Sequence, residues 1–378
     1  MRGASYFAGA ALIAGLGFGL AAWLEPARQD TDGNPSAISV TEVLQARSGE
    51  GFRPIEPPLT LIFPQDHGPH RDQQIEWWYF TGNLEADDGR TFGFQLTFFR
   101  IGLVAEASNR QSAWAATEQY MAHFALTDAE GQAFLAHERT ARGALGLAGA
   151  QADPFRVWTE TWSASSEGSS YFPLRLRAAA DEVSMDLSLT TDRAPVLQGD
   201  GGYSAKGGDP GNASAYVSFT RLDIQGRLVL GGEPVAVRGL GWMDHEWSTS
   251  VLGTDLAGWD WFSLHLEDGR DLMIYLLRRK DGTSSPFSAG TLVEASGAVR
   301  ALGPDDFEVL VHDHWTSPET GARYPAHWTL SVPSARLTLN LKPRIAAQEL
   351  VFGMSYWEGA VQSTGGLAAQ GYVELVGY

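Results

Sequence analysis

Apolar and polar residues alternate with a period of two over most of the chain, which is the spacing of side chains on one face of a β-strand. In "TFGFQLTFFR", Phe92, Phe94, Leu96 and Phe98 fall on one face and the intervening residues fall on the other. The same alternation recurs in "QYMAHFALTD", "EVSMDLSLTTD", "YVSFTRLDIQGRLVL" and "ARLTLNLKP". Asp-Gly and Glu-Gly pairs separate several of these runs, as antiparallel hairpins require. The pattern predicts an all-β protein without long helices in its globular part.

The number and spacing of the predicted strands indicate two domains. Antiparallel sheets must protect their edge strands, and closure into a barrel does so. One run of strands ends at "GRLVLGGEPV" and another begins at "WDWFSLHL", on either side of residues 237–247. The chain of 378 residues is long enough for two such units. We therefore expect one barrel over residues 59–236 and a second barrel over residues 237–378.

The N-terminus has the features of a targeting segment. Arg2 precedes "YFAGAALIAGLGFGLAAWL", an uncharged run at residues 6–24 whose length lies between that of the hydrophobic region of a signal peptide and that of a minimal spanning helix. Residues 25–58 are polar and contain glycine and proline without sustained periodicity. We expect residues 1–24 to be a signal peptide or an uncleaved membrane anchor and residues 25–58 to be a flexible linker, so that the rest of the chain is exported. A buried hydrophobic hairpin is the alternative for the terminal run.

Charge and cysteine content exclude several classes of function. The chain has 27 Lys and Arg residues and 45 Asp and Glu residues, which give a net charge of −18. Because this negative charge repels the phosphate backbone, nucleic acid is not an expected partner. There is no cysteine, so disulfides, thiol catalysis and cysteine-bearing zinc sites are excluded. The sequence also lacks a G-x-S-x-G nucleophile motif, so a serine hydrolase is not expected.

Two short segments combine carboxyl groups, histidines and tryptophans. The first is "DHGPHRDQQIEWWYFTGNL" at residues 66–84, and the second is "WMDHEW" at residues 242–247. Carboxyl groups that are buried among indole rings are expected to have raised pKa values, which is a feature of functional sites. Alternation places Asp244 and Glu246 on one strand face and His245 on the other. A buried network of structural ion pairs is therefore the alternative to a reactive site.

Several segments together resemble one protein family. In chain order they are "FPQDHGPHRDQQIEWWYFTGNL", "YMAHFALTD", "GLGWMDHEWST", "GWDWFSLHLEDGRDLMIYLLR" and "YWEGAV" followed by "GYVELVGY". From Leu61 to Tyr378 the chain resembles the family of AttH and carotenoid 1,2-hydratase, in the form of its secreted branch of predicted hydrolases. The resemblance implies two tandem lipocalin-like β-barrels in a bacterial envelope protein, periplasmic or secreted. It also implies relatives that add water to the terminal double bond of acyclic carotenoids, and others that are encoded beside an ABC exporter.

The resemblance and the residue chemistry together give a site hypothesis. Protonation of an alkene requires a strong, desolvated acid, and aromatic rings stabilise the cation that forms. Asp244 fits the role of general acid, and His245 or Glu246 would hold or deprotonate the attacking water. For His123 the strand pattern leaves both a cavity-facing and a surface position open. The expected ligand-binding residues are Glu76, Trp77, Trp78, Tyr79, His123, Trp242, Trp247, Trp259 and Trp261.

Possible metal donors occur in two places without a recognised metal motif. Asp66, His67 and His70 lie close together in the sequence, and "VHDHW" adds His312 and His314. Neither segment has the H-E-x-x-H pattern. A zinc site assembled across loops is one interpretation, and a bend fixed by glycine and proline is the other. We expect the bend, with no metal and no cofactor.

The sequence thus favours an exported protein that binds an extended apolar ligand, an isoprenoid or a lipid, and that catalyses acid-assisted hydration or cyclisation of a double bond. The alternative is a non-catalytic carrier of lipids or hydrophobic metabolites that works with an ABC transporter in the membrane. A third class is a structural adaptor, which would have both barrel interiors filled by side chains.

Overall fold

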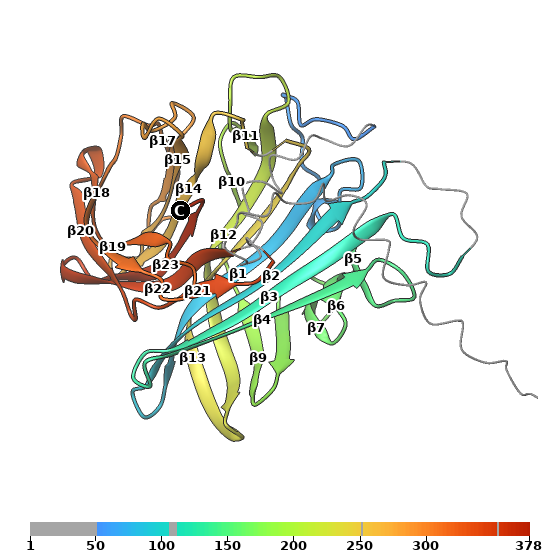
Figure 1. Ribbon diagram of the computed structural model, residues 1–378, viewed down its shortest axis with the longest axis horizontal. Coiled ribbons are helices and arrows are strands. Elements are labelled where there is room, and N and C mark those ends of the chain that lie inside the picture. Colours follow the sequence, from blue (N-terminus) through green and yellow to red (C-terminus); the bar gives the residue numbers. More distant parts are fainter. Residues whose placement is uncertain (1–50, 106–111, 251, 354) are drawn as a thin grey trace, which may run out of the picture.

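The computed structural model describes residues 51–105, 112–250, 252–353 and 355–378. These residues form two curled antiparallel sheets, coloured blue to yellow and yellow to red in Figure 1. The all-β, two-barrel prediction is therefore confirmed. The expected targeting segment, residues 1–24, and most of the expected linker lie outside the described residues. Within the described ranges, no helix is long and apolar enough to cross a membrane.

The first sheet contains thirteen strands and forms the first barrel. Its order is β4-β3-β2-β1-β13-β12-β9-β8-β7-β6-β5, and β10 and β11 pair with β12. Because β5 and β6 contact β3, the two ends of this sheet approach each other. The bounds are β1 Ile75–Ala86, β2 Thr91–Gly102, β3 Glu118–Asp128, β4 Ala133–Arg142, β5 Ala148–Ala152, β6 Phe155–Thr159, β7 Trp162–Ser166, β8 Leu174–Ala180, β9 Val183–Thr190, β10 Val196–Leu197, β11 Tyr203–Ala205, β12 Ala213–Leu230 and β13 Glu233–Ser248, with a 3-10 turn η1 at Gln65–His67.

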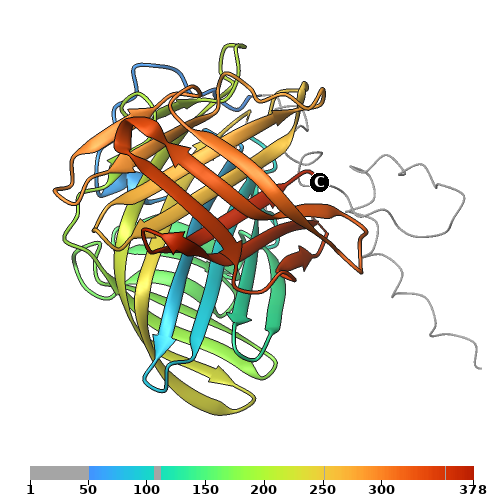
Figure 2. The same cartoon turned by 90° about the vertical axis from the view of Figure 1, so that its left-hand side faces the viewer.

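The second sheet contains ten strands and forms the second barrel, which faces the viewer in Figure 2. Its order is β17-β16-β15-β14-β23-β22-β20-β19-β18, and β21 pairs with β22. Residues from both ends of this order share one apolar core, so the sheet is also curled. The bounds are β14 Leu256–Leu266, β15 Asp271–Arg279, β16 Ala289–Val293, β17 Val299–Leu302, β18 Glu308–Thr316, β19 Arg323–Val332, β20 Leu337–Pro343, β21 Glu349–Val351, β22 Ser355–Gly366 and β23 Ala369–Val376, with a 3-10 turn η2 at Pro333–Ala335.

The chain passes from one sheet to the other later than the sequence suggested. The expected boundary at Val237 lies inside β13, which pairs with β1 and β12 along its length and completes the first barrel. The change of sheet occurs between Ser248 and Leu256. The end of the expected linker differs as well, because Ile55 is buried in a cluster with Trp247. Its apolar side chain belongs to the folded part of the chain.

Both barrels have apolar interiors. As the alternation predicts, Phe92, Phe94 and Phe98 of β2 lie in the first core. The second core contains Trp328 and Trp357, which are also fully buried. Burial of such large side chains is a major source of stability for each barrel. Large side chains inside both barrels are also the feature that the adaptor hypothesis expects.

The outer face of the first barrel is covered by the second sheet along β1, β2 and β3. Gln95 lies on the polar face of β2, yet it is buried and donates a hydrogen bond to the Tyr356 hydroxyl at 3.0 Å. Asn83 of β1 donates to the carbonyl oxygen of Gly371 at 2.9 Å. The interface between the barrels is therefore a second buried layer, rich in polar side chains that sequence alternation alone assigns to solvent.

Candidate functional site

Strands β1 and β13 form a wall with a different chemistry on each face. They are antiparallel neighbours in which Trp78 pairs with His245 and Tyr79 pairs with Asp244. Because successive side chains point to opposite faces, Trp78 and His245 point into the first barrel, and Tyr79 and Asp244 point towards the second. The predicted catalytic group of Asp244, His245 and Glu246 is thus divided by the sheet, as strand geometry requires.

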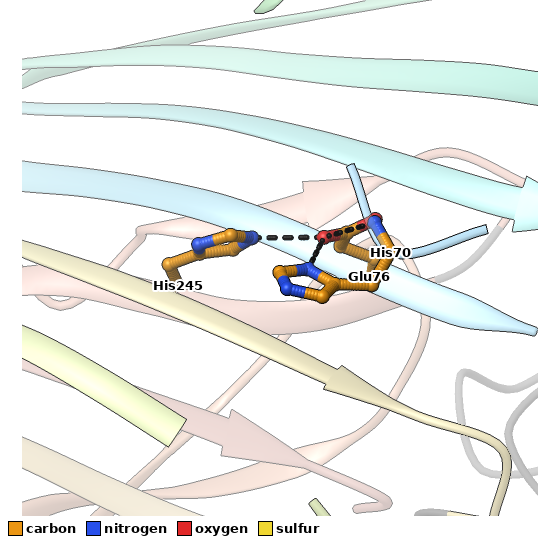
Figure 3. Close-up of side chains that lie close together, drawn as sticks. All are labelled: His70, Glu76 and His245. Carbon is orange, nitrogen blue, oxygen red and sulfur yellow. Dashed lines mark hydrogen bonds and ion pairs between the residues drawn. The ribbon is translucent and has the colours of Figure 1, made fainter. Parts of the chain in front are cut away.

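Glu76 is the centre of an ion network on the inner face of this wall. Its Oε1 atom lies 2.8 Å from Nδ1 of His70 and 2.9 Å from Nε2 of His245 (Figure 3). Its Oε2 atom accepts a hydrogen bond from Nε of Arg100 at 2.7 Å. Nε2 of His70 in turn lies 3.1 Å from Oδ1 of Asp66. Both carboxyl oxygens of Glu76 therefore have partners.

The ionisation of this network follows from its contacts. Burial opposes the ionised form of Glu76, but the hydrogen bonds from His245 and His70 and the charge of Arg100 lower its pKa overall. Burial also opposes protonation of His70, yet its bonds to Asp66 and Glu76 raise its pKa. For His245 burial prevails and lowers the pKa. Glu76 is thus a paired carboxylate and cannot act as a free acid on a ligand.

The loop donors named in the sequence do not form the expected zinc set. The ring of His67 stacks on Tyr171 at 3.5 Å, and burial lowers its pKa to about 3. His312 and His314 are on β18, where they contact Thr329 and Arg323. Among the described residues, three metal donors converge only at His70, Glu76 and His245.

Asp244 is the centre of a second polar cluster, between the barrels. Its Oδ2 atom accepts a hydrogen bond from the Tyr216 hydroxyl at 2.6 Å, and its Oδ1 atom accepts from Ser218 at 2.5 Å and from Nε1 of Trp242 at 2.7 Å. Burial nevertheless raises the pKa of Asp244 to about 7, against these three bonds. The Tyr216 hydroxyl also accepts from Nε1 of Trp261 at 3.0 Å.

Glu246 lies on the same face of β13 and has a charged partner. It forms an ion pair with Nζ of Lys206 at 3.1 Å and accepts a hydrogen bond from Ser214. Lys206 lies over the ring of Tyr275, 4.3 Å from its centroid. Since the ammonium group offsets Glu246, this residue is a paired ion, whereas Asp244 has no cationic partner in the described residues.

Two further acids complete this cluster, and the sequence reasoning missed both. Glu358 of β22 and Glu374 of β23 are directly opposite each other in the register of the two strands. Glu358 is 1% exposed, and burial followed by the charge of Glu374 raises its pKa well above the usual value. Glu374 is partly exposed and accepts a hydrogen bond from Nε1 of Trp259 at 3.2 Å. Burial raises the pKa of Glu374 to about 7.

Glu358 differs from the other acids because its carboxyl group has only a weak contact with the Tyr79 hydroxyl, outside ordinary hydrogen-bond geometry. In the described part of the chain, neither of its oxygens makes a hydrogen bond of ordinary length, and the same holds for the hydroxyl of Tyr79. Tyr79 lies close enough for its pKa to be raised by the charge of Glu358, after the larger effect of burial. Buried polar atoms without protein partners are usually satisfied by water or by a ligand. Glu358 and Tyr79 therefore have hydrogen-bonding capacity that the surrounding protein leaves largely unused.

Aromatic rings surround the interbarrel acids. Trp261 meets Tyr79 edge to face at 5.2 Å and Trp242 at 6.2 Å between ring centroids. Trp77 and Trp259 pack against the same cluster and are partly exposed. The predicted residues Tyr79, Trp77, Trp242, Trp259 and Trp261 are thus brought together, whereas Glu76, Trp78 and Trp247 lie on the other side of the wall.

His123 of β3 occupies neither of the two positions left open by the sequence. Phe124 and Leu126 face the first core, but His123 is fully buried because the second barrel covers it. Its Nδ1 atom lies 2.7 Å from the Tyr356 hydroxyl, and its Nε2 atom lies 3.2 Å from Glu138. His123 therefore belongs to the interbarrel layer, at the edge formed by β4.

The fold and the site define a two-barrel, lipocalin-like protein whose barrels enclose a cluster of acids and aromatic rings. The chain belongs to the AttH-like family, whose model matches residues 54–378. This confirms the resemblance seen in the sequence.

Two solved structures share this architecture, and one characterised protein shares part of the sequence. An AttH protein of Nitrosomonas europaea is 34% identical, with a TM-score of 0.79 over 86% of this chain and 99% of that chain. Kievitone hydratase from Nectria haematococca shares the fold at 16% identity, with a TM-score of 0.66 over 87% and 97% of the two chains. The dehydratase asqC of Emericella nidulans is 25% identical over 185 residues, which are 47% of this chain and 51% of that protein. The match thus spans about half the length of the dehydratase.

Proposed function

We propose that the protein adds water to, or removes water from, a carbon–carbon double bond of an extended apolar molecule between its two barrels. The observation that carries this proposal is Glu358, a fully buried carboxyl without a hydrogen bond of ordinary geometry, whose pKa burial and the charge of Glu374 raise well above its usual value. A carboxylic acid held neutral in a dry, aromatic environment is suited to donate a proton to carbon or to a leaving hydroxyl group. Asp244, the acid expected from the sequence, is instead held by three donors.

The proposed hydration conserves atoms and charge. The proton of Glu358 forms a new C–H bond with the electron pair of the double bond, and a cation remains on the adjacent carbon. The oxygen of a water molecule bonds to that carbon, and Glu374 takes the released proton. Because Glu358 and Glu374 are cross-strand neighbours, a proton can return from Glu374 to Glu358 and restore the starting state. Dehydration is the same sequence in reverse.

The surroundings of the two acids support each step. The indole rings of Trp242 and Trp261 and the ring of Tyr79 supply electron-rich surfaces for a cation. Glu374 is partly exposed, and its pKa of about 7 leaves it able to accept a proton near neutral pH. A protein of the same fold is named a hydratase and a partial sequence relative is named a dehydratase, which are opposite directions of this reaction.

The test uses Glu358→Gln in the full chain, purified in detergent because of the expected membrane segment. Wild type and variant are incubated with a panel of isoprenoid and polyene substrates in water labelled with heavy oxygen, and products are identified by mass spectrometry. The variant keeps the size and shape of the side chain but lacks its acidic proton. We expect turnover to fall by about 10²- to 10⁴-fold while substrate binding is retained.

The matched control is Glu308→Gln, an exposed glutamate of β18 remote from the interface layer. It should leave turnover unchanged. Binding of a panel member without turnover by the wild type would contradict the proposal and favour the carrier hypothesis. Failure to bind any member would favour the adaptor hypothesis, which the filled barrel interiors also fit.

A further inference from the structure

The geometry points to a binding site for a divalent transition metal of the zinc class on the inner face of the first barrel, formed by His70, Glu76 and His245. The site is independent of the proposed reaction, because it lies on the opposite face of the β1 and β13 wall from the interbarrel acids. Two imidazole nitrogens and one carboxylate oxygen are a donor set that zinc commonly uses.

The three donor atoms converge on one point. Nδ1 of His70 and Nε2 of His245 both face Oε1 of Glu76, at 2.8 and 2.9 Å, and the three atoms lie within 4.8 Å of one another (Figure 3). Zinc bonds of about 2.0 to 2.2 Å at tetrahedral angles place neighbouring donors roughly 3.4 Å apart. Each of the two contacts to Oε1 would therefore have to widen by about half an ångström when the ion binds.

The groups behind the donors orient them as a metal site requires. Oδ1 of Asp66 lies 3.1 Å from Nε2 of His70, so it fixes this ring with Nδ1 towards the centre. Carboxylates that accept a hydrogen bond from a ligating histidine are a common feature of zinc sites. On the other side, Arg100 donates to Oε2 of Glu76, and the backbone N–H of His70 is shared between Oε2 at 2.9 Å and Oε1 at 3.1 Å.

Charge and access are also compatible with an ion. Arg100 is a buried cation, which by itself would repel a metal, but it is paired with Glu76 and Glu118. Glu118 is shared with Arg71, and Asp66 adds a further carboxylate beside His70. The His70 side chain is 16% exposed, whereas Glu76 and His245 are almost fully buried. An ion can therefore enter on the His70 side of an otherwise closed site.

The test titrates Zn²⁺ alone into the full chain after treatment with a chelator, using calorimetry and elemental analysis. We expect one zinc per chain in the wild type, no high-affinity zinc in His70→Ala, and affinity that is about 10- to 100-fold weaker in Asp66→Asn. His312→Ala, on exposed β18, is the matched control and should bind zinc as the wild type does. Zinc should also raise the melting temperature of the wild type and of the control but not that of His70→Ala.

His70→Ala is preferred to changes at buried His245, and its fold is checked by circular dichroism. A tetrahedral cobalt spectrum in the wild type that disappears in folded His70→Ala would give further support. Wild-type protein that takes up no zinc, or His70→Ala protein that binds zinc as tightly as the wild type, would overturn the site.

Discussion

Replacement of Asp244 by asparagine should change stability in opposite directions at low and high pH. The pKa of Asp244 is raised from 3.8 to about 7 by burial, so the folded protein holds a proton that the unfolded chain releases. A raised acid pKa makes stability fall as pH rises from about 4 to about 7, and stability then stays constant above the folded pKa. Asparagine does not ionise, so the variant lacks this pH-dependent loss.

The magnitude follows from the contacts and the size of the shift. A difference of roughly 3 pKa units corresponds to about 4 kcal/mol at pH 8. Asparagine can keep the bonds from Ser218 and Trp242 to its oxygen, but its nitrogen cannot accept from the Tyr216 hydroxyl, which costs about 1 to 3 kcal/mol. The variant should therefore be less stable by about 1 to 3 kcal/mol at pH 4 and more stable by a similar amount at pH 8.

The assay is urea-induced unfolding followed by tryptophan fluorescence at intervals of pH between 4 and 8. The two stability curves should cross between about pH 5 and 6. Asp305→Asn, in the exposed loop before β18, is the control and should run parallel to the wild type. Parallel curves for Asp244→Asn and the wild type would refute the reasoning, because they would show that Asp244 has the same pKa in the folded and unfolded states.

Two other substitutions test the packing of the fold. Arg100→Met should lower the free energy of unfolding by about 3 to 5 kcal/mol, because it removes the main cationic partner of the buried Glu76 carboxylate. A loss below about 1 kcal/mol in urea unfolding would contradict the ion network. Gly93→Ala would place a new Cβ atom 2.6 Å from the Cβ atom of Ala360 across the barrel interface, so we expect the free energy of unfolding to fall by about 1 to 3 kcal/mol. The control is Gly303→Ala, whose new Cβ atom has no neighbour closer than 3.5 Å and which should be nearly neutral in the same measurement.

The strands and the direction of their side chains could be predicted from the sequence. Alternation along "TFGFQLTFFR" predicted that Phe92 and Phe94 lie in a core, as they do. Alternation along "WMDHEW" predicted that His245 and Asp244 point to opposite faces of the strand, and the structure has this arrangement. The domain boundary could not be found in this way, because β13 pairs with β1 and no local pattern records which distant strand is a neighbour.

The acids of the interface were harder to recognise for a related reason. Glu358 and Glu374 stand at polar positions of strands, which alternation assigns to solvent, and they become buried only because a second barrel covers that face. A signal was nevertheless present, because "YWEGA" and "GYVEL" each enclose a single acid among aromatic and aliphatic residues. A carboxyl group in such a context deserves the same consideration as the more conspicuous Asp244.

The shared wall of β1 and β13 limits how this protein can be altered by evolution or by engineering. A shift of β1 by one residue in its register with β13 would exchange the two faces of β1, so that Glu76 would point at the second barrel and Trp77 into the first. Both sites would be lost in a single step, whereas insertions at the hairpin tip near residues 87–90 would shift neither face. Chimeras that combine barrels of different relatives should therefore be joined after Ser248, so that β13 stays with the strands that it closes.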